Sequence, residues 1–187
     1  MSLFKSRFHS EKTPLTPARS PATERVMRSI EYLGLDSAQA MLVGSGALCL
    51  YGIELDDFDP ITDRRHPRPN DLDFACSPLY MNDLSQHGTT TGLMPVVKHT
   101  FSQRQTILTI AAPEMPADII TRFQPGRDQL MAYHDRFLAY FAKNSRPIAG
   151  IDMRIITPPA LLRELRHNAL DPKAAHDLSR ARRHFGS

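Results

Sequence analysis

The order of hydrophobic and polar positions predicts helices at both ends of the chain and mostly strands between them. Apolar residues at helical spacing predict helices over residues 22–33, 47–51, 78–86, 128–143, 158–168 and 172–183. Short apolar or alternating runs predict strands over residues 41–43, 71–76, 93–101, 106–111, 117–123 and 148–156. Residues 53–69 are rich in charge and proline and predict a loop. The fold class expected is α/β (α+β), with a small mixed β-sheet flanked by helices and a helical C-terminal region.

The length and composition favour one globular domain with a short extension. The chain has 187 residues, of which 41% are hydrophobic. Three prolines in the first 21 residues predict a flexible basic N-terminal segment over residues 1–21, followed by a single domain over residues 22–187. Its last part, about residues 157–187, would be the C-terminal helices. No apolar run approaches the roughly 18 residues of a membrane-spanning helix, so we expect no contact with a membrane.

The cysteines and the start of the chain indicate a cytoplasmic protein. Cys49 and Cys76 have no metal-ligand spacing, and two small core thiols suit a reducing compartment. The N-terminus is basic but has no apolar stretch of the kind found in secretory leaders. The net charge of +3 belongs to residues 1–25, which hold five basic and two acidic residues, so the remainder is neutral. Such a tail is either a solvated leader or a contact to the phosphates of RNA or DNA.

Two Asp-x-Asp pairs occur in the sequence, and their contexts differ. Fourteen aspartates in 187 positions give about one such pair by chance, so the pattern alone is uninformative. Asp57 and Asp59 lie in the charged segment, where solvated carboxylates need no special explanation. Asp71 and Asp73 alternate with apolar residues, so on a strand both carboxylates would project from one face. Only the second pair is therefore a candidate for chemistry.

A cation would relieve the repulsion between the two carboxylates of the second pair. Like charges within roughly 7 Å of each other on one strand face repel unless a cation or water separates them. Mg²⁺ takes oxygen ligands and leaves coordination positions for substrate phosphates. Asp118, in a short apolar run, is the best candidate for a third carboxylate ligand. The alternative interpretation is that Asp118 lies at a strand end and faces solvent. If the carboxylates bind metal together, they must converge near one another.

The segment Gly44-Ser45-Gly46 lies between a predicted strand and a predicted helix. Small residues at this position let a phosphate approach the backbone, where a helix N-terminus offers free N–H donors. No Gly-Lys-Ser/Thr follows, so the segment is not a Walker loop. An ordinary tight turn is the alternative interpretation.

Together these segments resemble the DNA polymerase β-like nucleotidyltransferase superfamily, and in particular small bacterial nucleotidyltransferases of the abortive-infection toxin type. The family signature is a Gly-Ser turn opening a helix, a strand carrying Asp-x-Asp, and a third acidic residue on a neighbouring strand. The resemblance rests on five segments: LVGSGALCLYG (42–52), RPNDLDF (68–74), ADIITRF (117–123), IDMRIITPPALLREL (151–165) and PKAAHDLSRAR (172–182). The chain departs from the family in its long segment 53–69 and in the position of its arginine, one residue nearer the Asp pair.

The resemblance implies a set of site residues. Catalytic roles, with coordination of one or two Mg²⁺ ions, would fall to Asp71, Asp73 and Asp118. Nucleotide-binding roles would fall to Gly44, Ser45, Arg68 and Lys173, although Lys173 is equally well explained as a surface residue of a helix pair. Asp177 would be a structural or active-site partner of that lysine.

The implied activity is Mg²⁺-dependent transfer of a nucleoside monophosphate from a nucleoside triphosphate such as ATP to an acceptor hydroxyl, releasing pyrophosphate. The acceptor would belong to RNA such as tRNA, to a protein or to a small molecule; the basic residues 64–68 and both basic termini favour a polyanionic acceptor such as RNA. A toxin would also have a cognate antitoxin protein as partner. The alternative function is a catalytically inactive binding or regulatory module on the same fold. A metal-dependent phosphohydrolase ranks last, because no histidine accompanies the carboxylates.

Overall fold

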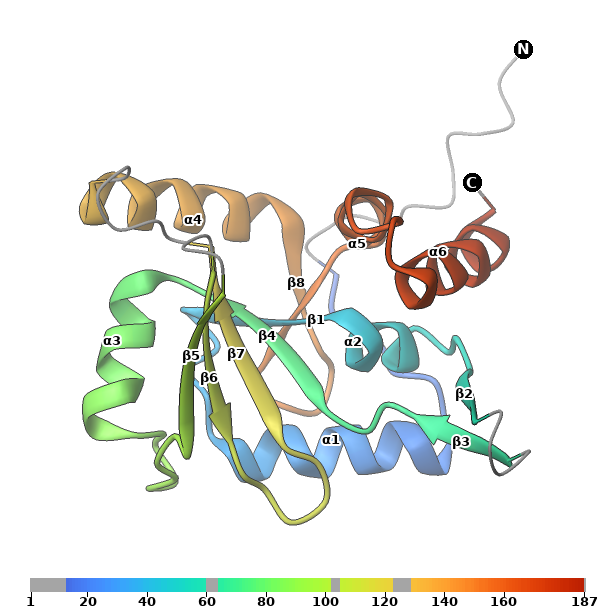
Figure 1. The fold of residues 1–187 in the computed structure, drawn as a ribbon, viewed down its shortest axis with the longest axis horizontal. Coiled ribbons are helices and arrows are strands. Elements are labelled where there is room, and N and C mark those ends of the chain that lie inside the picture. The colour runs from blue at the N-terminus through green and yellow to red at the C-terminus, as the bar shows by residue number, and fades with distance from the viewer. Residues whose placement is uncertain (1–12, 60–63, 102–104, 123–128, 187) are drawn as a thin grey trace.

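A computed structural model describes residues 13–59, 64–101, 105–122 and 129–186. Its helices are α1 (Pro21–Leu33), α2 (Gly44–Leu50), α3 (Pro78–His87), α4 (Leu130–Asn144), α5 (Pro158–His167) and α6 (Pro172–Phe185). Its strands are β1 (Ala40–Val43), β2 (Leu55–Asp59), β3 (Arg64–Arg68), β4 (Leu72–Cys76), β5 (Val97–Phe101), β6 (Gln105–Ile110), β7 (Ala117–Thr121), β8 (Ser145–Pro147) and β9 (Arg154–Ile156). The protein is an α/β protein with a mixed sheet and a helical C-terminal pair, which confirms the fold class predicted from the sequence (Figure 1).

The main sheet places β4 at its centre. Within the described ranges the strand order is β5-β6-β7-β4-β1-β9-β8, and β2 pairs with β3 in a separate two-stranded ribbon. β4 runs antiparallel to β1 and parallel to β7, and β1 runs parallel to β9. The strand that carries the second Asp-x-Asp pair therefore lies between the strand that leads into α2 and the strand that carries Asp118.

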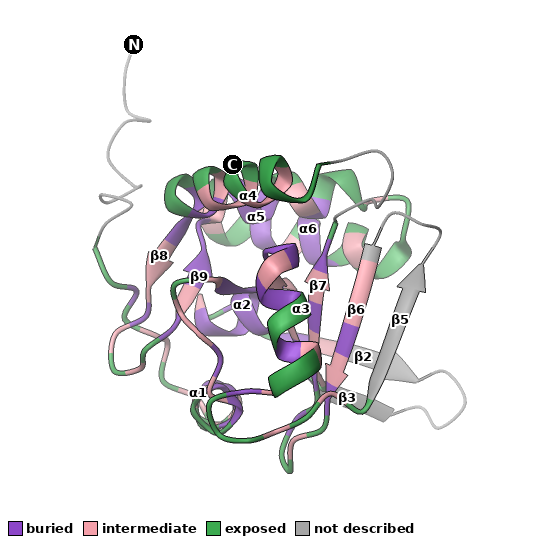
Figure 2. Cartoon of the chain, turned by 90° about the vertical axis from the view of Figure 1, so that its left-hand side faces the viewer, coloured by how far each residue is buried: buried purple, intermediate pink, exposed green. Residues whose placement is uncertain are grey.

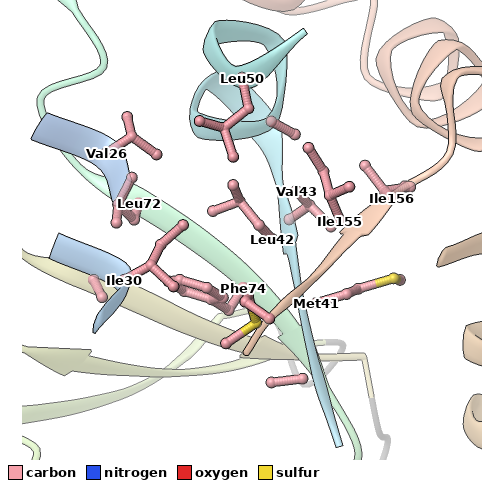
Figure 3. Packing of buried hydrophobic residues seen from close by; sticks show 14 of the residues in the cluster. Val26, Ile30, Met41, Leu42, Val43, Leu50, Leu72, Phe74, Ile155 and Ile156 are labelled. Atoms are coloured by element: carbon pink, nitrogen blue, oxygen red, sulfur yellow. The ribbon is translucent and has the colours of Figure 1, made fainter. Parts of the chain in front are cut away.

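One face of the sheet packs against α1. Leu72 and Phe74 are fully buried, whereas the residues that alternate with them in β4 are partly exposed. Val26 and Ile30 project from α1 onto these two side chains (Figure 3). The strand period of two therefore directs the apolar residues of β4 into the core and its aspartate to the opposite face.

The predicted helices begin and end at recognisable capping residues. The Ser20 hydroxyl accepts a hydrogen bond from the Thr23 amide at 3.1 Å, and Gly34 ends α1 with a φ of 60°. The Ser77 hydroxyl caps α3 in the same way, accepting from the Tyr80 amide at 3.2 Å. α2 begins at Gly44 rather than at residue 47, and Figure 2 shows it buried through nearly its whole length.

The prediction of a loop over residues 53–69 is wrong for residues 55–59 and 64–68, which form the β2–β3 ribbon, and its residues 60–63 lie outside the described ranges. The register sets Asp59 opposite Arg64 and Asp57 opposite His66. The backbone register therefore sets acidic positions of β2 opposite basic positions of β3. The charges that indicated a loop belong to both members of a strand pair.

Two further strand boundaries differ from the prediction. The strand predicted at residues 148–156 is a turn followed by β9, and its antiparallel partner is β8. Ile148 and Met153 are buried within that turn, and the Ile148 amide donates to the Met153 carbonyl at 3.0 Å, so an apolar turn had been interpreted as a strand. The strand predicted from residue 93 begins at Val97. The predicted strand end at residue 123 and helix start at residue 128 lie outside the described residues.

In the part of the chain that the structure describes, every helix is too short or too polar to cross a bilayer.

Candidate active site

The Gly44 turn lies directly against Asp73. Val43 is the cross-strand partner of Asp73 in the antiparallel pair of β1 and β4, and Gly44 follows as the first residue of α2. Gly44 has a φ of 60°, and a β-carbon at this position would overlap Oδ2 of Asp73. Glycine is therefore required here both for the left-handed backbone and for the space that the carboxylate occupies.

The parallel pairing of β4 and β7 brings two of the predicted carboxylates together. Asp73 and Asp118 are Cα partners in this register, on strands that lie roughly 4.8 Å apart. Asp71 precedes β4 by one residue, and all three side chains are partly buried. The predicted neighbourhood of Asp71, Asp73, Asp118 and the Gly44 turn is thus present in the fold.

The environment of Asp73 disfavours the ionised form of its carboxyl group. Burial, followed by the negative charges of Asp71 and Asp118, raises its pKa to about 7. Glu164 contributes in the same direction, whereas the positive charge of Lys173 lowers the pKa of Asp73. A nearby positive charge therefore favours the ionised form of this group near neutral pH, and Lys173 contributes in this direction.

Asp118 is held by a neighbouring strand. The Thr109 hydroxyl of β6 donates a hydrogen bond to Oδ1 of Asp118 at 2.6 Å, and the two residues are Cα partners in the β6–β7 register. This short bond fixes one oxygen of the carboxylate and leaves the other available. Thr109 was not predicted as a site residue, since only the strand pairing brings it beside Asp118.

A cavity of about 980 Å³ opens beside Asp73. It lies between one face of the sheet, the helix α4 and the helix α5. The sheet side consists of residues from β1, β4 and β7 with the Gly44 turn: Met41, Val43, Gly44, Asp73, Ala75, Cys76 and Ile120. The helical side is aromatic and charged: Tyr133, Arg136, Phe137, Tyr140, Leu161, Arg163, Glu164, Leu165, Arg166, His167 and Asn168, with Arg122 at the end of β7. Its size is at the upper end for small-molecule sites.

Arg68 is buried rather than placed in the cavity lining. It is 3% exposed, and its guanidinium makes a two-point ion pair with Asp177 of α6, with Nη2 to Oδ1 at 2.5 Å and Nη1 to Oδ2 at 3.3 Å. The Arg25 guanidinium of α1 donates to the carbonyl of the next residue, Pro69, at 2.7 Å. The segment that leads into the Asp-x-Asp pair is therefore attached to α1 and α6, and the geometry gives Arg68 a structural contact.

The remaining predicted nucleotide contacts occupy different environments. Ser45 is buried in the first turn of α2, whose N-cap residue makes no side-chain hydrogen bond to the helix. Lys173 is exposed on the first turn of α6, close enough to influence Asp73 electrostatically. Asp171 caps that helix by accepting from the Lys173 amide at 2.8 Å.

The three carboxylates suit a hard divalent cation in chemistry, but they do not form a closed cage. Among the residues described, no three His, Cys, Asp or Glu side chains stand close enough to hold one metal ion together. Mg²⁺ is usually bound by one or two carboxylates, with water and substrate phosphates completing its shell. The strained Asp73 with one neighbouring aspartate fits that pattern, whereas a metal cage made by the protein alone does not.

A further carboxylate of the cavity, Glu164 of α5, was also not predicted from the sequence. Glu164 follows Leu161 by three residues and precedes Leu165, so helical spacing places it beside the buried face of α5. An acidic residue beside an apolar helix face was the available signal.

Comparison of the chain with protein-family models, with curated protein sequences and with solved structures finds no match. The interpretation of the site therefore rests on its own geometry.

Proposed function

We propose that the protein is a Mg²⁺-dependent nucleotidyltransferase of the DNA polymerase β-like type, which moves a nucleoside monophosphate from a nucleoside triphosphate to an acceptor hydroxyl. The observation that carries the proposal is the contact of Gly44 with Asp73, together with the pairing of Asp73 with Asp118, at the edge of a large cavity. It joins the three short motifs that were dispersed over 75 residues of sequence.

In this mechanism the chain positions the triphosphate and neutralises charge. Asp71 and Asp73, with Asp118 beside them, would hold one or two Mg²⁺ ions, which supply positive charge to the phosphates and the leaving group. Small side chains at Gly44 and Ser45 leave the backbone open to the phosphates. Lys173 adds a positive charge near Asp73.

The acceptor hydroxyl oxygen would attack the α-phosphorus as the bond from this phosphorus to the oxygen bridging to the β-phosphate breaks. Pyrophosphate would leave with the electron pair of the broken bond, and Asp118 would take the proton of the hydroxyl. Most of the rate enhancement in such a transfer comes from alignment and electrostatic stabilisation.

The test is transfer of label from an α-³²P nucleotide to cell RNA, to protein or to the small-molecule fraction by the purified protein with Mg²⁺. Asp71→Ala and Asp73→Ala should each abolish labelling. Asp59→Ala, in the other Asp-x-Asp pair of the chain, is the matched control and should label normally. Equal labelling by Asp73→Ala and the unmodified protein would contradict the assignment of the site.

A second candidate is a nucleotide-binding module without transferase activity. It is favoured by the lack of a closed three-ligand metal site among the described side chains. This function predicts saturable nucleotide binding, with no labelled product from any acceptor fraction.

A further inference from the structure

Glu164 lines the cavity from α5, and its carboxylate is held by a single weak bond. The Tyr140 hydroxyl donates to Oε1 at 3.3 Å, which is long for a hydrogen bond between oxygen atoms. Over the described residues, this is the one hydrogen bond that the carboxylate accepts. An ionised carboxylate has about four acceptor positions, so most of the accepting capacity of Glu164 is directed to whatever occupies the cavity.

A partly buried carboxylate with unused acceptor positions is stabilised by donors. Burial raises the pKa of Glu164, while Arg122, the Tyr140 hydroxyl and Arg163 act in the opposite direction. Neither arginine lies within ion-pair distance of Glu164, and the Arg163 guanidinium donates to Oδ1 of Asn144 at 2.7 Å. The protein therefore provides a favourable electrostatic environment for this carboxylate without filling its acceptor positions.

The walls around Glu164 suit a flat ligand. Tyr133, Phe137 and Tyr140 line the cavity from successive turns of α4, and Ile120 and Ala75 line it from the sheet. Aromatic and aliphatic surfaces on two sides of a cavity favour a planar, largely apolar ring. A donor group on such a ring could hydrogen-bond to the carboxylate of Glu164, on the helical side of the cavity.

The charge of the helical side of the cavity, away from Asp73, disfavours a cationic organic ligand. The acidic residues of the lining are Asp73 and Glu164. The lining also holds four arginines: Arg122, Arg136, Arg163 and Arg166. An ammonium group, as on a polyamine or an aminoglycoside, would be repelled by this excess of positive charge. The donor that Glu164 accepts from therefore belongs to a neutral ring, attached to an anionic group that the arginines attract.

We infer that Glu164 recognises the base of the nucleotide by accepting a hydrogen bond from an exocyclic amino group, so that the site selects an amino-bearing base. The inference rests on the proposed function, because it assigns the base end of the same nucleotide whose phosphates lie at Gly44 and Asp73. Carboxylates accept from base amino groups in nucleic-acid recognition, and a site built for such a donor rejects an analogue without it. Glu164 is thus a specificity-determining residue.

The test compares nucleotides that differ by a single amino group. Isothermal titration calorimetry with the full chain and Mg²⁺, without acceptor, would measure binding of ATP against purine riboside triphosphate, GTP against ITP, and CTP against zebularine triphosphate. In at least one pair the amino-bearing nucleotide should bind about 10- to 100-fold more tightly, as expected for a hydrogen bond to a charged group. Equal affinities within all three pairs would overturn the inference without any variant being made.

Variants then assign the preference to Glu164. Glu164→Met keeps the length of the side chain but lacks an acceptor, and it should bring the two affinities of the selective pair to within about twofold. Glu164→Gln retains an acceptor oxygen and should recover part of the preference. Glu31→Met, at an exposed glutamate of α1, should leave the preference for the amino-bearing nucleotide unchanged. A full preference in a folded Glu164→Met protein would refute the role of this residue.

The outcome separates this inference from the proposed function. Selective binding with no labelled product would support the role of Glu164 and contradict the transferase. Transfer of label with no preference for amino-bearing nucleotides would support the transferase and contradict the role of Glu164. No binding of any triphosphate would contradict both.

Discussion

Arg68 and Asp177, 109 positions apart, form a buried two-point ion pair that joins the end of the β2–β3 ribbon to α6. Their side chains are 2% and 6% exposed. An arginine of α6, Arg180, donates to Asp56 at 2.9 Å and to the Glu54 carbonyl. Since α6 also carries Lys173, these contacts connect the segment before Asp71 to the helix that places a positive charge near Asp73.

Breaking the Arg68–Asp177 pair should destabilise the protein strongly. Asp177→Asn leaves a buried guanidinium without its counter-charge, which costs about 3–5 kcal/mol of unfolding free energy. Arg180→Gln, at the partly exposed pair, should cost about 1 kcal/mol or less. Urea unfolding measures the loss of unfolding free energy in both variants. Equal losses would show that the buried ion pair contributes no more to stability than the partly exposed one. The double variant Arg68→Met/Asp177→Leu should recover most of the lost stability, because it leaves no uncompensated charge.

Gly44→Ala should cost more than a positive φ alone explains. A β-carbon at Gly44 meets Asp73, whereas one at Gly150, with a φ of 91°, meets nothing within 4 Å. Gly150→Ala should therefore lose about 1–2 kcal/mol from backbone strain, and Gly44→Ala should lose this and also displace the carboxylate. Denaturant unfolding and the nucleotide-transfer assay check the pair. Near-normal transfer by Gly44→Ala would mean that the placement of Asp73 beside the turn is not needed.

The metal-free protein should lose stability as the pH rises from about 4 to about 8. The pKa of Asp73 is raised from 3.8 to about 7 by burial and then by Asp71 and Asp118. A carboxyl group whose pKa is raised on folding stabilises the folded state fully below the unfolded pKa, and this contribution disappears as the pH rises through the folded pKa. The shift corresponds to roughly 4 kcal/mol at most.

Urea unfolding in a chelator at pH 5 and pH 8 tests this dependence. Asp73→Asn removes the titrating group and should flatten the profile, becoming more stable than the unmodified protein at pH 8. Asp83→Asn, at an exposed carboxylate of α3, is the control and should follow the unmodified protein. An identical pH profile for Asp73→Asn would show that this carboxyl group is not strained.

The sequence was sufficient to predict the elements whose pattern is local. The capped helices α1 and α3, the strand β4 and the helical C-terminal pair were all predicted, because spacing and capping residues determine them within a few positions. The β2–β3 ribbon was missed because its segments are rich in charge and proline and carry no alternating apolar pattern, which is the signal that predicts a strand.

The residues of the candidate site also form two groups, those predicted from local context and those whose contacts depend on packing. Asp71, Asp73 and Gly44 were predicted from local context and lie together, since the antiparallel β1–β4 register brings the Gly44 turn to Asp73. The contacts of Thr109 and Arg68 depend on which strand or helix packs beside them, and no local signal contains that information. The sequence placed Arg68 in the same motif as the aspartates, but its partner lies more than 100 residues away.

Thr109→Val should weaken metal binding and transfer without unfolding the protein. Valine keeps the β-branched shape that suits β6 but cannot donate to Oδ1 of Asp118, so this carboxylate loses its fixed orientation. Loss of such a supporting hydrogen bond typically costs 10- to 100-fold in metal affinity or activity, so the Mg²⁺ concentration for half-maximal transfer should rise by about tenfold or more. Thr106→Val, on the same strand but opposite Thr121, is the matched control and should leave this concentration unchanged. If the two variants have the same Mg²⁺ dependence, Asp118 does not act through the orientation that Thr109 gives it, and the third carboxylate of the site must be sought elsewhere.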